Sequence, residues 1–78
     1  MNKIAKPGDI GRHVKEKRKN DDLTQADLAS LCSVGIRLIS ELENGKPTIQ
    51  VGKILQVLEC LGLEMKIVPR GRVEETEL

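Results

Sequence analysis

Apolar residues recur at three- and four-residue spacing along most of the chain, a pattern typical of amphipathic helices. It predicts four helices, at about residues 9–20, 24–32, 35–43 and 49–61. Asp9 is the expected N-cap of the first helix, and Thr24 with Asp27 three residues later forms a capping box at the second. Gly45, after Asn44, is expected to end the third helix in a left-handed conformation.

The fourth helix has more apolar positions than one face can hold. One face accounts for Val51, Ile54, Leu55, Leu58 and Leu61. Ile49, Val57 and Cys60 lie outside this stripe. We therefore expect the helix to bury two faces, the second of them against a partner chain.

After Gly62 the apolar spacing changes to two, which predicts a strand within residues 63–70. A lone strand cannot satisfy its own backbone hydrogen bonds, and no second strand is expected. Pairing with the same strand of a second copy solves this problem, so we expect a homodimer. The expected dimer contacts are Val57, Cys60, Leu63, Met65 and Ile67.

Charge is distributed unevenly along these 78 residues, although the net charge is only +1. Residues 1–20 carry seven basic and two acidic side chains, whereas the remainder carries six basic and ten acidic ones. A basic front half suits a polyanion partner. The complete lack of aromatic residues excludes base stacking on single-stranded nucleic acid.

The sequence offers too few groups for catalysis or metal binding. His13 is the single histidine, and Cys32 and Cys60 stand 28 positions apart, so neither a metal set nor a nucleophile–base pair is expected. We expect no enzyme activity and no cofactor. No apolar run approaches the roughly 18 residues of a membrane span, and the start lacks the apolar region of a signal peptide. A cytoplasmic protein is therefore expected.

Residues 24–45 form the strongest motif, two short helices joined by a turn of about four residues. This is the arrangement of a helix-turn-helix, whose second helix enters the major groove of DNA. Ala29 is small where the two helices would cross. The expected buried seam is Leu28, Cys32, Val34, Ile39 and Leu42, and the expected outward positions are Gly35, Ile36, Arg37, Ser40 and Glu41.

Two motifs within this region resemble the Cro/lambda-repressor-type (XRE) family. They are Leu-Thr-Gln-x-x-Leu-Ala at residues 23–29 and Ile-Ser-x-Leu-Glu-Asn-Gly-Lys at 39–46, and the likeness covers about residues 9–62. A single strand in place of a fifth helix is similar to HipB-type antitoxins. Ser33 departs from the pattern, since the family often has glycine in the turn. The resemblance implies an all-α, four-helix lambda-repressor-like DNA-binding domain with one C-terminal β-strand pairing across a homodimer.

The resemblance also implies roles for individual residues. Gln25 would anchor a phosphate at a helix N-terminus, Arg37 would read guanine, and Ile36 would contact a thymine methyl group. Ser40 would reach a phosphate or a base edge, and Lys46 a phosphate. The complete set of expected DNA contacts is Thr24, Gln25, Gly35, Ile36, Arg37, Ser40 and Lys46.

A buried ion pair between Arg18 and Glu43 is a further implication, as architecture rather than as a site. Divided by role, the chain comprises an N-terminal arm (1–8), the DNA-binding domain (9–62), the dimerisation strand (63–70) and a flexible acidic tail (71–78).

These observations predict a sequence-specific DNA-binding repressor. Its expected partners are an inverted-repeat operator in double-stranded DNA and a second copy of the chain. The resemblance to HipB-type antitoxins further implies a HipA-type kinase toxin as partner and autoregulation of its own operon. Two alternatives stay open. One is a stand-alone XRE-type transcriptional regulator without a toxin, and the other is a protein-interaction module that does not bind DNA.

Overall fold

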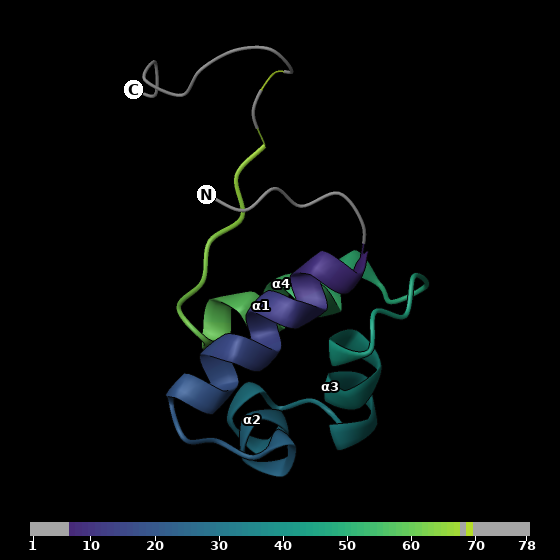
Figure 1. The fold of residues 1–78 in the computed structure, drawn as a ribbon. Helices are drawn as coiled ribbons and strands as arrows, with labels where there is room; N and C mark the ends of the chain where they lie inside the picture. The colour runs from purple at the N-terminus through teal and green to yellow at the C-terminus, as the bar shows by residue number, and fades with distance from the viewer. Residues whose placement is uncertain (1–6, 68, 70–78) are drawn as a thin grey trace.

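The computed structural model describes residues 7–67 and 69 of the chain, and the part that it describes is all helical apart from turns and extended segments (Figure 1). Its helices are α1 (Pro7–Asn20), α2 (Gln25–Cys32), α3 (Ile36–Glu43) and α4 (Val51–Cys60). The predicted all-α class with four helices is confirmed. No strand is present within the described residues, so the pairing expected at 63–70 stays a prediction.

Helix α1 begins two residues earlier than the sequence predicted. Pro7 occupies its first position, where the N–H that proline lacks would have no partner within the helix. The fixed φ of proline also favours helix initiation there. Asp9 therefore lies in the first turn, not at the N-cap, and Arg12 Nη1 donates to its carboxylate at 3.3 Å. Residues 1–6 of the predicted arm and residues 71–78 of the predicted tail lie outside the described residues.

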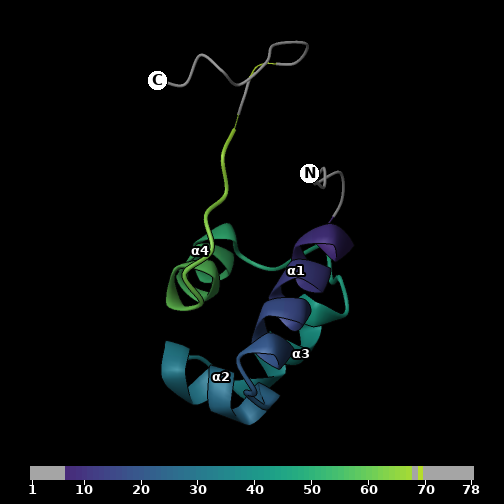
Figure 2. The same ribbon diagram turned by 60° about the vertical axis from the view of Figure 1, so that its left-hand side comes forward.

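Each helix contributes one completely buried side chain to the centre of the core, namely Val14, Leu28, Ile39 and Val57. Around them pack further buried residues, Ala29, Cys32, Leu42, Leu58 and Leu61, with Val34 partly buried against the cluster. The seam predicted from the helix-turn-helix motif is thus confirmed. Helix α1 packs on α3, and α2 packs on both α3 and α4. In Figure 2, α4 lies on one side of the molecule, with α1 and α3 on the other.

Gly11 sets how closely α1 approaches the end of α3. A Cβ atom at this position would overlap the carbonyl oxygen of Leu42 and lie 3.1 Å from Cα of Glu43. Because both obstacles belong to the backbone, neither can move aside as a side chain would. The close crossing of α1 and α3 therefore depends on glycine at this position.

Caps and turns fix the ends of α2 and α3. At the predicted capping box, Asp27 N–H donates to Thr24 Oγ1 at 3.0 Å and Thr24 N–H donates to Asp27 Oδ2 at 2.9 Å. The turn after α2 places Ser33 at φ 59°, a left-handed conformation that glycine adopts most easily and that a serine occupies here. Gly45, at φ 81°, follows α3 as predicted.

The inward face of α4 is the main correction to the sequence analysis. Val57, expected at the dimer contact, has no exposed surface and packs in the core of its own chain. Val51 and Leu55, expected inward, are 64% and 48% exposed. Ile54 and Leu58 belong to two overlapping apolar stripes on α4, one that includes Val51 and Leu55 and one that includes Val57. The stripe that includes Val57 packs into the core. Val57 is therefore withdrawn from the predicted dimer surface.

Candidate DNA-binding surface

Helices α2 and α3, with the link at residues 33–35 between them, form the helix-turn-helix unit. The inner side of α3 is anchored by Ile39 and Leu42, both buried in the core. This anchoring leaves the opposite side of α3 to face solvent, as the alternation of apolar and polar residues predicted.

The start of α3 presents the predicted base-reading residues together on one exposed surface. Gly35 is the N-cap, and Ile36 directly after it is 51% exposed. Arg37 is more exposed still, with 89% of its side chain accessible to solvent. Ser40 is half-buried, and Lys46 is exposed just beyond the helix. Guanidinium donors beside an apolar side chain are the groups that read guanine edges and thymine methyl groups in the major groove.

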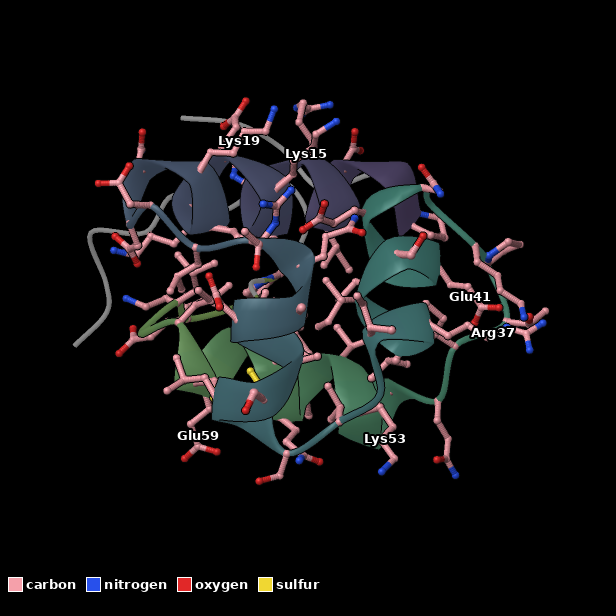
Figure 3. All side chains as sticks on the ribbon, turned by 90° about the horizontal axis from the view of Figure 1, so that it is seen from below. Lys15, Lys19, Arg37, Glu41, Lys53 and Glu59 are labelled. Carbon is pink, nitrogen blue, oxygen red and sulfur yellow. The ribbon has the colours of Figure 1, made fainter. Side chains whose placement is uncertain are left out.

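Glu41 links two of the cations on this surface, a feature that the sequence analysis did not predict. Arg37 Nε donates to Glu41 Oε2 at 3.2 Å, and Lys46 Nζ lies 3.3 Å from the same oxygen. Figure 3 shows Arg37 and Glu41 side by side on the outer face of α3. The i to i+4 spacing of Arg37 and Glu41 was the available sign of this contact.

The N-terminus of α2 is the predicted phosphate anchor. Two N–H groups of the first turn already have partners within the protein. The N–H of Asp27 donates to Thr24 Oγ1 at 3.0 Å, and the N–H of Leu28 donates to the Thr24 carbonyl oxygen, also at 3.0 Å. The N–H groups of Gln25 and Ala26 precede the first bond of the helix, so they are the donors that a phosphate would meet. The Gln25 side chain has another partner, since its Nε2 donates to Glu43 Oε1 at 3.1 Å.

The expected ion pair between Arg18 and Glu43 is present and almost fully buried, with side-chain exposures of 9% and 2%. Arg18 Nε donates to Glu43 Oε2 at 2.7 Å and Nη2 donates to Oε1 at 3.0 Å. Arg18 Nη1 also donates to the carbonyl of Leu23 at 2.8 Å. With Gln25 on the same carboxylate, the pair connects α1, the start of α2 and the end of α3. It therefore fixes how α3 is presented to a ligand.

Ionisation of this pair is favoured by its surroundings. Burial of the Glu43 carboxylate opposes its charge, but the hydrogen bonds from Arg18 and Gln25 and the positive charges of Arg18 and Lys15 outweigh burial. The pKa of Glu43 consequently lies below its ordinary value of 4.5. The hydrogen bond with Glu43 raises the pKa of Arg18. Both groups are therefore charged at neutral pH.

The remaining predicted dimer residues lie away from this surface, on α4 and the segment after it. Cys60 and Leu63 are partly buried against the core, whereas Met65 and Ile67 are exposed, Ile67 almost completely at 96%. Burial raises the pKa of the Cys32 thiol to about 12, with a hydrogen bond to Cys60 as the second cause. Cys60 packs against the core cluster that contains Cys32.

Within residues 7–67 and 69, no group of three or more His, Cys, Asp or Glu side chains is arranged to hold a metal ion. Among the helices described, none combines the length and the apolar character that crossing a bilayer requires.

Residues 14–68 match the helix-turn-helix family model. Because the match spans well over half of the chain, the chain belongs to this family, as its XRE-type motifs predicted, and it is a DNA-binding transcription regulator. It is 48% identical over 69 residues to the uncharacterized HTH-type transcriptional regulator y4mF of Sinorhizobium fredii. The aligned stretch covers 88% of this chain and 91% of the relative.

Solved structures of HipB have the same fold. A HipB variant in a complex with an O2 20mer has a TM-score of 0.80 and 26% identity, covering 90% of this chain and 97% of that one. HipB in a HipA-HipB-O2-O3 complex has a TM-score of 0.80 at 24% identity, a likeness of fold alone, over 90% of this chain and 99% of that one.

Proposed function

We propose that this regulator is a sequence-specific repressor and the antitoxin of a HipBA-type toxin–antitoxin pair, which binds the operator of its own operon. The observation that carries the proposal is the exposed start of α3, where Ile36 and Arg37 stand out from a helix held by the buried Arg18–Glu43 pair. The match in fold to HipB bound to an O2 20mer supports it.

On DNA, the work would be divided between two kinds of contact. Lys46 and the N–H groups at the start of α2 would bind phosphates, which gives affinity without sequence preference. Arg37 would bind guanine O6 and N7 and supply about 1–3 kcal/mol of discrimination at that base pair. Ile36 would favour a thymine methyl group nearby.

Dimerisation would place two α3 helices in successive major grooves, about one helical turn apart, so the operator is an inverted repeat. The apolar surface of one chain supports a dimer. Val51 and Leu55 on α4 are exposed, as are Met65 and Ile67 after it. Residues 63–67 would become a strand by pairing with the same segment of a second copy, which supplies the missing backbone partners.

A kinase toxin is the proposed protein partner, and its support is the likeness to HipB in the HipA-HipB-O2-O3 complex. A second candidate is a stand-alone regulator. The similar protein of Sinorhizobium fredii favours it, because the name of that protein refers only to transcriptional regulation.

A pull-down of the tagged protein from its native host, with nuclease added to remove DNA bridging, distinguishes the two. Recovery of one stoichiometric kinase-like protein encoded beside this chain supports the antitoxin, and recovery of the protein alone favours the stand-alone regulator.

Footprinting on the DNA upstream of the gene tests the operator claim. We expect two protected half-sites in inverted orientation. No specific protection would leave the protein-interaction module as the better account.

A further inference from the structure

The carboxylate of Glu41 lies on the surface that the proposed function turns toward DNA. Its Oε2 accepts from Arg37 Nε at 3.2 Å and lies 3.3 Å from Lys46 Nζ. One carboxylate thereby pairs with both the proposed base reader and the proposed phosphate contact.

Helix stability does not explain this arrangement. Arg37 lies in the first turn of α3, at the positive end of the helix dipole, and Glu41 lies in the last turn, at the negative end. Each charge therefore faces the end of like sign. The order is also the weaker one for an i,i+4 pair, which is stronger with the acidic residue first. Since exposed pairs add little stability in any case, the contact calls for a different explanation.

A carboxylate in this position weakens binding to any DNA backbone. Non-specific affinity rises with the number of phosphates that cations neutralise, and Glu41 offers Arg37 and Lys46 an internal counter-charge in place of a phosphate. Its negative charge also repels phosphates directly. Both effects act on the phosphate contacts that every sequence offers, and random DNA has no specific base contact to offset them.

The geometry of the Arg37 contact leaves base recognition possible. Glu41 holds Nε, which leaves the two terminal nitrogens of the guanidinium for a ligand. Those nitrogens can form the bidentate pair with guanine O6 and N7 while Nε stays on the carboxylate. Glu41 can therefore orient Arg37 for guanine at the same time as it discourages contact with phosphate.

We propose that Glu41 is a specificity-determining residue of α3, which lowers affinity for non-specific DNA and positions Arg37 for guanine. This inference rests on the proposed function of sequence-specific DNA binding.

Glu41→Gln tests it, with Glu59→Gln as the matched control. Glu59 is an exposed carboxylate on α4, and Figure 3 shows it far from Arg37 and Glu41. The control variant makes the same change in net charge away from α3. Binding is measured by fluorescence anisotropy at several salt concentrations. The two probes are a duplex of random sequence and the best duplex that the wild-type protein selects from a randomised pool.

We expect Glu41→Gln to bind the random duplex more tightly. Neutralising one more phosphate steepens the salt dependence by about 0.9, which corresponds to roughly eightfold in affinity at about 0.1 M salt for each subunit engaged. The selected duplex should gain less, so the ratio of specific to non-specific affinity falls. In an Arg37→Ala background the effect on the random duplex should be smaller. Unchanged thermal unfolding of Glu41→Gln confirms that the variant is folded.

Equal behaviour of Glu41→Gln and Glu59→Gln on both duplexes would overturn the proposal. So would a loss of affinity for the selected duplex without any gain on the random one, because Glu41 would then have no effect on non-specific binding. A wild-type protein that selects no sequence at all would overturn the proposed function together with this inference, an outcome separate from the other two.

Discussion

The Glu43→Gln substitution removes the negative charge from the buried pair with Arg18 while it keeps the size and shape of the side chain. The guanidinium of Arg18 would remain in place, with 9% of its side chain exposed. The new amide would point one N–H donor at the N–H donors of Arg18 and Gln25, which cannot accept a hydrogen bond. Gln25 would lose the charged acceptor of its hydrogen bond as well. An unpaired charge is thus left in the core at the junction of three helices.

Removing one partner of a buried ion pair costs about 3–5 kcal/mol, since the other charge keeps its desolvation penalty. A chain of 78 residues has a total unfolding free energy of about 4–12 kcal/mol at typical stability per residue. The substitution therefore removes a large share of the stability. At about 4–8 °C per kcal/mol for a domain of this size, the melting temperature should fall by at least about 12 °C.

Thermal unfolding followed by circular dichroism measures this change, at one protein concentration because dimerisation would shift the transition. Glu59→Gln is again the control, and we expect its unfolding free energy to stay within about 0.5 kcal/mol of wild type. A melting temperature for Glu43→Gln no lower than that of the control would refute the role assigned to the buried pair.

The same pair predicts a dependence of stability on pH. Because the pKa of Glu43 is lower in the folded chain than its ordinary 4.5, its contribution is complete above pH 4.5 and is lost as the pH falls through the folded value. The pKa of Asp27 is lowered too, by its hydrogen bonds with Thr24, so wild type alone cannot separate the two carboxyl groups. The difference in unfolding free energy between wild type and Glu43→Gln should therefore shrink below pH 4.5. A constant difference would contradict the lowered pKa.

Three further substitutions or modifications have clear expected outcomes. Gly11→Ala should destabilise the chain by about 1–3 kcal/mol or more through the clash with α3. Its control is Gly52→Ala, whose Cβ meets nothing within 4 Å and which should stabilise the chain by up to about 1 kcal/mol. Equal urea midpoints for the two variants would contradict this. Cys32, with its thiol pKa raised to about 12, should resist iodoacetamide at pH 8 until the protein unfolds. Rapid labelling of Cys32 in the native protein, as distinct from Cys60, in peptide mass spectrometry would disprove its burial. Arg37→Ala should lower affinity for the selected duplex by about 1–3 kcal/mol and affinity for random DNA much less, and an equal loss on both would make Arg37 a phosphate contact.

Local rules predicted the elements that position the candidate site. The capping box at Thr24, the stop at Gly45 and the buried seam through Leu28 and Ile39 follow from spacing and residue type alone. The Arg18–Glu43 pair came from the family resemblance, because partners 25 positions apart in the sequence leave no local sign of contact.

The features that the sequence did not predict depend on how the helices pack. Val57 and Leu55 both fit an apolar face of α4, and the packing of α4 against the other helices decides which of them is buried. Gly11 looks like any glycine within a helix until α3 crosses beside it. Glu41 was predicted only to face outward, and its pairing with Lys46 depends on the turn that follows α3.

Sequence-specific binding to DNA through α3 is the central claim, and an anisotropy titration tests it most directly. The wild-type protein is titrated against the duplex upstream of its own gene and against a shuffled duplex of equal length and composition, at one physiological salt concentration. We predict an upstream complex that contains two chains and is at least about a thousandfold tighter than the shuffled one. Equal affinity for both duplexes would contradict the claim.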